Sequence, residues 1–374
     1  MNSRFSKIFD YDWVANSAIV FLIGTGLIAI YSLSLESEAL GLTNFERQLV
    51  FLAIGAVFFF VFSSIDYRNW KSYSGLFYVF GIILLVAVLL WGRVIRGTSG
   101  WFTIGTFGFQ PAEAMKLFLI ISLAHYFSRS VQSIVTIKHI LVSAIYTLIP
   151  VSLAIKQPDL GSAMVMIVIW LGMLFFAGLP KKYTAIILLI GIVFSFFAWN
   201  GILKPYQKDR IMTFVNPQKD PLGKGYNVIQ SMVAVGSGGI WGKGLGHGSQ
   251  SRLNFLPEKH TDFIFATIAE ESGLVGSFLV LGLFGLLIFR LKTIADKSKD
   301  EFGRMLVGGV MVMIFFQILV NVGMNLGIMP VAGLSLPLLS YGGSFLITTL
   351  IMLGLVQSVW KKRRKRAMVS VEDE

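Results

Sequence analysis

Four carboxylates stand close together in one short segment, FLPEKHTDFIFATIAEESGLVG at 255–276. Its first part is polar and holds Glu258 and Asp262, whereas its second part is apolar and holds Glu270 and Glu271. The last two are adjacent, so on a helix their side chains point about 100° apart, and we expect one of them to face a polar cavity. Because an ionised group in apolar surroundings is costly, this segment is the first candidate for a chemical site.

Asp262 is the carboxylate best placed for chemistry. It follows His260 and Thr261 at the expected start of an apolar helix. In a partly dry setting, a carboxylate can accept a proton from a substrate as a general base. At the same position it could instead cap the free N–H groups of the helix, and the residues alone leave both interpretations open.

The composition places the chain in the membrane class. Hydrophobic residues make up 55% of the 374 and charged residues only 14%, whereas soluble domains carry about 25% charged residues. A spanning helix needs roughly 20 mostly apolar residues. Ten segments meet this requirement, at about 14–33, 47–64, 74–91, 111–128, 139–156, 160–178, 183–199, 262–289, 305–327 and 343–360.

We therefore predict an all-α integral membrane protein of about ten transmembrane helices, folded as one polytopic membrane domain over 1–374. A long extracytoplasmic loop at 200–261 separates the seventh and eighth helices, and its aromatic and aliphatic residues indicate that it is structured. The chain has no cysteine, which excludes disulfide bonds, thiolate metal sites and a cysteine nucleophile.

The distribution of lysine and arginine predicts the orientation in the membrane. Most of these residues, including the run KKRRKR in the tail at 361–374, fall on the side of the two termini, and the short loops opposite hold few. Basic loops mark the cytoplasmic side, so both termini are expected in the cytoplasm. The net charge of +12 then reflects topology and contact with anionic membrane lipids, and no nucleic acid is expected as a partner.

The outer segments differ in composition. The loop at 92–109 has the glycine, threonine and tryptophan content of an ordered loop, and Pro111 suits the first position of a helix. The segment at 329–344 is uncharged and interrupted by Pro and Gly, so it is not one straight helix; such backbone must be buried in protein or line a wet cavity. Within the long loop, YNVIQSMVAV predicts a short helix and GSGGIWGKGLGHGSQ a tight, mobile hinge.

Ionisable residues inside spans are functional candidates because each is costly in lipid. Glu113 and Lys116 are three residues apart on one helix and can form an ion pair, which either holds the bundle together or lines a polar cavity. Asp159 stands at a helix start, where it caps the helix or faces the cavity, and His125 is expected to be a packed histidine. A row of amides on one face of a later helix predicts hydrogen bonds between helices: Gln317, Asn321 and Asn325.

Several long motifs resemble the SEDS family (shape, elongation, division and sporulation proteins). They are GWFTIGTFGFQPAEAMK, KQPDLGSA, GSGGIWGKGLGHGSQ, RLNFLPEKHTDFIFATIAEESG and MPVAGLSLPLLSYGGS, and together they extend over nearly the whole chain in the expected order. The stretch PVAGLSLP is more similar to the elongation branch, RodA, than to the division branch, FtsW. Phe345 is a departure, since many relatives have a small residue after YGGS.

This resemblance implies a peptidoglycan glycosyltransferase of the bacterial cytoplasmic (inner) membrane. Such an enzyme polymerises lipid II, an undecaprenyl-pyrophosphate-linked disaccharide pentapeptide, into a growing glycan strand during cell elongation. It works beside a class B penicillin-binding protein, the transpeptidase that crosslinks the strands. The resemblance makes Asp262 the catalytic residue, and inversion at the donor sugar suits a single displacement with this aspartate as base. The candidate substrate-binding or cavity residues are Glu113, Lys116, Asp159, Arg210, Lys243, Arg252, His260, Thr261, Ser340 and Tyr341.

The departing pyrophosphate also requires positive charge. Arg210, Lys243, Arg252 or a divalent cation, Mg²⁺ or Mn²⁺, would supply it, and the sequence assigns no metal site. The alternative function is a lipid II flippase or another polytopic lipid transporter, because many spans with buried charges and broken helices are typical of transporters too. Polymer formation by the purified protein distinguishes the two.

Overall fold

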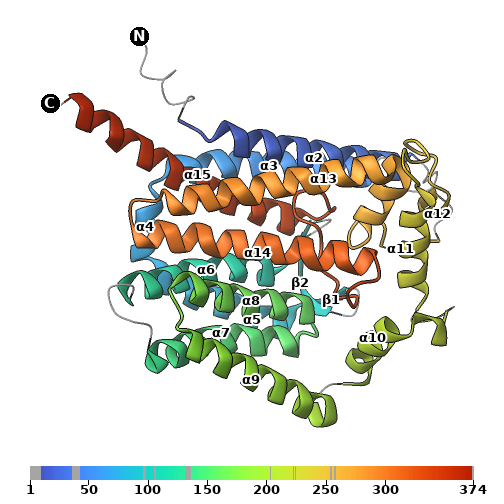
Figure 1. Ribbon diagram of the computed structural model, residues 1–374, viewed down its shortest axis with the longest axis horizontal. Coiled ribbons are helices and arrows are strands. Elements are labelled where there is room, and N and C mark those ends of the chain that lie inside the picture. Colours follow the sequence, from blue (N-terminus) through green and yellow to red (C-terminus); the bar gives the residue numbers. More distant parts are fainter. Residues whose placement is uncertain are drawn as a thin grey trace.

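The computed structural model covers residues 1–374 and describes all of them except 1–9, 36–42, 96–97, 105–106, 131–135, 203, 222, 224, 253–254, 257 and 373–374. Long helices occur where the sequence predicts the spans, and they pack lengthwise into one bundle (Figure 1). Among the described residues they are α2 (Trp13–Ser34), α3 (Thr43–Ser64), α5 (Ser74–Trp91), α6 (Pro111–Ser130), α7 (Ile137–Lys156), α8 (Leu160–Phe176), α9 (Lys181–Phe197), α13 (Ile264–Asp296), α14 (Glu301–Asn325) and α15 (Gly343–Glu372).

Seven of the described helices are long and apolar enough to cross a membrane by length and composition. The other three are α6, which carries Glu113 and Lys116, and α8 and α9, which have 17 residues each. The all-α membrane class is thus confirmed, and the count of ten spans stays a prediction. The centre of the bundle is α14, which packs against α13, α8 and α6, while α15 packs along α3 and α2 along α13.

The helix ends assigned to the cytoplasmic side meet at one end of the bundle (Figure 1). At the start of α2, Asp12 pairs with Arg290 near the end of α13 at 2.6 Å. Asp300, the N-cap residue of α14, pairs with Arg68 of α4 (Tyr67–Ser72) at 3.0 Å. Lys361 of α15 lies 3.5 Å above the ring of Tyr11. The N-terminal end of α2 and the C-terminal part of α15 therefore lie at the same end of the bundle.

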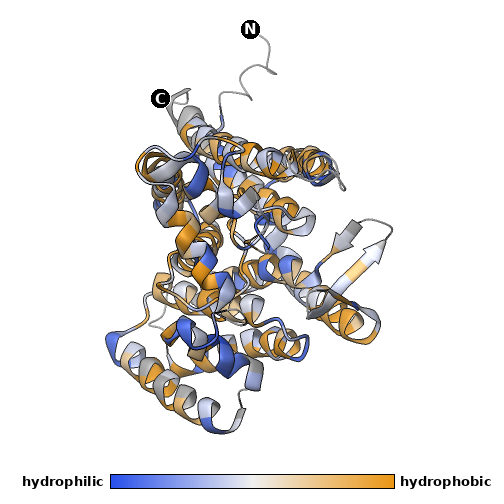
Figure 2. Ribbon diagram, turned by 90° about the vertical axis from the view of Figure 1, so that its right-hand side faces the viewer, coloured by the Kyte–Doolittle hydropathy of each residue, from blue (hydrophilic) through white to orange (hydrophobic). Residues whose placement is uncertain are grey.

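The opposite end carries the long loop and a small sheet. Strands β1 (Arg93–Ile95), β2 (Thr98–Ile104) and β3 (Phe107–Phe109) form an antiparallel sheet in that order, which projects from the side of the bundle in Figure 2. The sequence predicts an ordered loop here, and the strands are a difference from that prediction. The loop itself contains the π-helical turn η1 (Ala198–Ile202), α10 (Pro205–Val215), the 3₁₀ turn η2 (Pro217–Lys219), α11 (Tyr226–Ser237) and α12 (Ser249–Arg252). Helix α11 confirms the short helix predicted from YNVIQSMVAV.

The uncharged segment between α14 and α15 is irregular, as its Pro and Gly residues predicted. It folds back into the protein, where Leu334, Leu336, Leu338 and Leu339 are all buried. Burial in protein is what irregular backbone at membrane depth requires. His125 is half-buried, with its Nδ1 atom hydrogen-bonded to the Ser74 hydroxyl, whereas its Nε2 atom has no partner among the described residues.

Candidate functional site

The backbone around Asp262 is held by two amides of α14. The carbonyl oxygen of Asp262 accepts hydrogen bonds from Asn321 Nδ2 at 2.9 Å and from Asn325 Nδ2 at 3.0 Å. Asn321 Nδ2 also donates to the carbonyl of Leu334 at 2.7 Å, which ties the irregular segment to the same point. Asn325 also accepts from the backbone amide of Ala266 in α13, so the predicted hydrogen bonds between helices include this one, and both asparagines brace the turn as well.

The irregular segment holds the two residues before Asp262. The Ser340 hydroxyl donates to the carbonyl of Thr261 at 2.7 Å, and the Tyr341 amide donates to the carbonyl of His260 at 2.9 Å. Ser340 Oγ in turn accepts from the amide of Leu336 at 2.8 Å. Ser340 and His260, both predicted at the cavity, thus belong to the hydrogen bonds that hold the turn before Asp262, and neither lines the cavity.

Asp262 is not the N-cap residue of the helix that follows it. Helix α13 begins at Ile264, and its N-cap residue is Phe263, whose side chain makes no cap hydrogen bond. The free amide of Ala266 is instead satisfied by Asn325 Oδ1 at 3.1 Å. The side chain of Asp262 is half-buried and lines a cavity.

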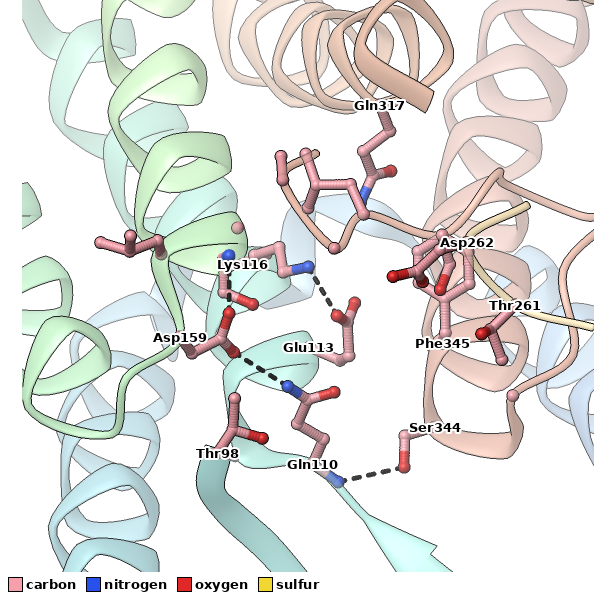
Figure 3. Close-up of a pocket in the computed structure, with 18 of the residues that line it drawn as sticks. Thr98, Gln110, Glu113, Lys116, Asp159, Thr261, Asp262, Gln317, Ser344 and Phe345 are labelled. Carbon is pink, nitrogen blue, oxygen red and sulfur yellow. Dashed lines mark hydrogen bonds and ion pairs between the residues drawn. The ribbon is translucent and has the colours of Figure 1, made fainter. Parts of the chain in front are cut away.

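This cavity has a volume of about 200 Å³ and brings together residues from distant parts of the chain (Figure 3). Glu113 and Lys116 lie at one wall, with Lys116 Nζ 2.6 Å from Glu113 Oε1. Both are buried, so the predicted pair exists and it also lines the cavity. Of the other predicted residues, the lining includes Asp159, Arg210, Thr261, Asp262 and Tyr341.

Asp159 fulfils both roles that the sequence left open. Its Oδ1 atom accepts from the amide of Ser162 at 2.9 Å and caps α8. Its Oδ2 atom accepts from Gln110 Nε2 at 2.9 Å within the cavity wall. The backbone N–H of Gln110 donates to Ser344 Oγ at 3.1 Å, which links the start of α6 to α15.

Lys243 and the two adjacent glutamates lie outside the cavity lining. Lys243 Nζ is 2.9 Å from Glu270 Oε1, and Glu270 also accepts from the amides of Gln250 at 2.9 Å and Ser251 at 3.0 Å. Lys243 is thus engaged in holding the loop, so its prediction as a cavity residue is wrong. The buried carboxylate satisfies several donors at once, which makes Glu270 an anchor for the loop.

Glu271 anchors the same loop from the other side. Its Oε1 atom accepts from the amide of Gly246 at 3.1 Å and from the Ser32 hydroxyl. The prediction that either Glu270 or Glu271 faces the cavity is therefore wrong, because the loop needs both.

The glycine-rich stretch is tight, as predicted, but it is fixed to a break in α13. Gly242 has φ +81° and Gly273 has φ +66°, and a Cβ atom on either would come within 2.3 Å of backbone of the facing segment. The amides of Leu274 and Val275 also bond to the loop, at 2.9 and 3.2 Å. These bonds anchor the glycine-rich stretch to α13, in contrast to the mobile hinge that the sequence predicts. Arg252 ends α12, and its side chain lies outside the described residues.

Several lining residues were not named as site residues from sequence. Thr98 and Trp101 come from the unpredicted strand β2, Gln110 precedes the predicted helix start, and Ser344 lies in the first turn of α15. Gln317 was interpreted as a contact between helices, yet it also lines the cavity. Gln110 and Ser344 could have been found, since they stand inside the quoted motifs.

A second, apolar cavity of about 620 Å³ adjoins the polar one, and Ser344 lines both. Its walls are aromatic and aliphatic side chains of α3, α5, α6 and α15, including Phe58, Phe77, Phe118 and Ile347. The arrangement therefore offers a polar chamber beside an apolar groove, which suits a ligand with a polar head and a long hydrocarbon chain.

Residues 14–365 match the FtsW/RodA/SpoVE family of cell cycle proteins. The chain belongs to this family. It is 40% identical over 319 residues to the peptidoglycan glycosyltransferase MrdB of Escherichia coli, covering 85% of this chain and 86% of that protein. It is 32% identical to the peptidoglycan glycosyltransferase RodA of Treponema pallidum, covering 95% and 99% of the two chains.

The fold of this FtsW/RodA/SpoVE protein is also that of solved relatives. It matches a chain from the structure described as "Structural coordination of polymerization and crosslinking by a peptidoglycan synthase complex", with a TM-score of 0.80 and 35% identity. The match covers 94% of this chain and 98% of that chain. With its family and its apolar helices, the protein is a multi-pass membrane protein.

Proposed function

We propose that this protein is a peptidoglycan glycosyltransferase that polymerises lipid II into glycan strands during cell elongation. The observation that carries the proposal is the placement of Asp262, whose backbone is braced from two sides while its side chain faces a polar cavity. A catalytic group must be held in position to be effective. The assignment to elongation rests on the relatives named MrdB and RodA.

In the reaction, a hydroxyl oxygen of one sugar attacks the anomeric carbon of another. The new C–O bond forms as the bond to the pyrophosphate oxygen breaks, and the pyrophosphate leaves with the electron pair. Asp262 takes the hydroxyl proton as general base. One displacement with one base inverts the configuration at the donor carbon.

Positive charge for the leaving pyrophosphate comes from the cavity wall. Arg210 lines the cavity, with Nη1 3.4 Å from the carbonyl of Val331. A guanidinium can hold two phosphate oxygens at once. Among the described residues, no three His, Cys, Asp or Glu side chains are grouped to hold a metal ion. A divalent cation would therefore take most of its ligands from pyrophosphate and water, as Mg²⁺ commonly does.

Each of the two cavities would accommodate a different part of the substrate. The polar cavity, at about 200 Å³, is smaller than typical ligand pockets of about 300–1,000 Å³, so only part of the head group enters it. The apolar groove that shares Ser344 with it takes part of the undecaprenyl chain.

The experiment that tests this function is polymer formation from purified lipid II, with and without a class B penicillin-binding protein of the same cell. We expect polymer, and a higher rate with the partner, because the similar structure concerns a complex that coordinates polymerization and crosslinking. Lipid transport in vesicles without any polymer would instead support the flippase. Rates unchanged by every class B protein of the cell would refute the partnership.

The orientation can be tested with single cysteines, because the chain has none of its own. Gln218 in the long loop and Lys297 after α13 are both exposed. In the bacterial cytoplasmic membrane, with both termini in the cytoplasm, Gln218→Cys is expected to react with a membrane-impermeant maleimide on intact cells. Lys297→Cys should react only after the cells are opened. The reverse pattern would overturn the assignment.

A further inference from the structure

The amide row on α14 divides into two kinds of residue. Gln317, Asn321 and Asn325 recur every four residues and so share one helix face. Asn321 and Asn325 use their amides to brace the catalytic turn and the irregular segment. Gln317 lies one turn away and is 1% exposed, and its Oε1 atom is buried without a hydrogen-bond partner among the residues that the structure describes.

A buried amide oxygen without a partner destabilises the fold, because its hydrogen bonds to water are lost and nothing replaces them. An aliphatic side chain of similar size would fill this place without that loss. Gln317 also lines the polar cavity, and Figure 3 shows its amide directed toward the space between Lys116 and Asp262. A molecule that enters the cavity could supply a partner for this atom.

The hydrogen-bonding capacity of the Gln317 carboxamide indicates which part of the substrate would bind to it. A pyrophosphate offers only acceptors and suits cations such as Arg210, and a hydrocarbon chain offers neither donor nor acceptor. A carboxamide is neutral and presents one donating and one accepting atom side by side. It therefore pairs best with a neutral group that can both donate and accept hydrogen bonds, such as neighbouring hydroxyls of a sugar.

We propose that Gln317 is a positioning residue that binds the saccharide of the substrate, and this inference rests on the proposed function. A sugar hydroxyl donates to Oε1, and Nε2 donates to a neighbouring sugar oxygen. A sugar held there lies between α14 and the catalytic turn, with a further hydroxyl directed at Asp262. The position of Gln317 on the helix that also braces Asp262 fixes the distance between the two contacts.

The test compares two ligands that differ in the sugar. The purified Gln317→Leu variant in nanodiscs is titrated with lipid II and, separately, with undecaprenyl pyrophosphate, which has no saccharide. We expect the Kd for lipid II to rise about fivefold to tenfold, as for the loss of hydrogen bonds to a neutral group. The Kd for undecaprenyl pyrophosphate should not change, and the Tm without ligand should stay the same or rise.

Asn321→Leu is the matched control on the same helix face. Because Asn321 has its partners within the protein, its loss should lower the Tm. A lowered Tm for Gln317→Leu, with equal weakening of both ligands, would show a packing role and refute the proposal. Unchanged lipid II binding would refute it too. If wild type binds lipid II with this saccharide dependence but makes no polymer, the proposed enzyme function fails while the Gln317 contact stands.

Discussion

Asp262→Asn is expected to leave the protein folded and able to bind lipid II, and to lower the polymerisation rate at least about 100-fold. That is the low end of what a positioned general base contributes. The substitution keeps the size of the side chain and leaves untouched the backbone carbonyl to which Asn321 and Asn325 donate. It removes nearly all basicity. The measurement is glycan strand length and yield from lipid II, at matched Tm.

Glu258→Gln is the matched control for Asp262→Asn. It removes a negative charge from the same turn, where exposed Glu258 accepts from the Thr261 hydroxyl at 3.0 Å, but Glu258 does not line the cavity. The control should keep most of the activity. Near-normal polymerisation by Asp262→Asn would refute the role of Asp262 as general base. Equal losses in both variants would point to the net charge of the turn rather than to a base.

The long apolar segments predicted the helix positions well because burial of a helix in lipid demands about 20 apolar residues in sequence. The same reasoning could not place Glu270 and Glu271. Both lie in an apolar helix, which suggested a ligand cavity, yet their partners are amides of a loop some 20 residues earlier in the chain. A sequence shows that a buried carboxylate needs donors, but only the tertiary fold shows which donors these are.

Gln317 and Lys243 also show that the sequence alone does not identify the tertiary partners of a polar side chain. The spacing of Gln317 with two asparagines predicted a shared role. The irregular segment and the turn of Asp262 supply partners to Asn321, and the same turn and α13 supply partners to Asn325. Gln317 Oε1 has no such partner among the described residues. Lys243 stands in a basic loop and seemed free to meet a phosphate, whereas the fold gives it Glu270. Asp262, Glu113 and Lys116 were predicted at the cavity because their motifs resemble a known family, and the structure brings the three together.

Glu113→Gln is expected to be the most destabilising single change at the site, because it leaves the ammonium of Lys116 buried without its counter-ion. Lys116 is 1% exposed, and breaking a buried pair costs about 3–5 kcal/mol in soluble proteins. The double variant Glu113→Gln with Lys116→Met removes both charges, so it should unfold at a higher temperature than Glu113→Gln alone. Activity cannot separate these cases, since both residues line the cavity; the readout is the Tm of wild type, the two single variants and the double variant in one detergent. Strictly additive Tm changes would mean that the two side chains do not interact, and the 2.6 Å contact would then contribute nothing to the stability of the bundle.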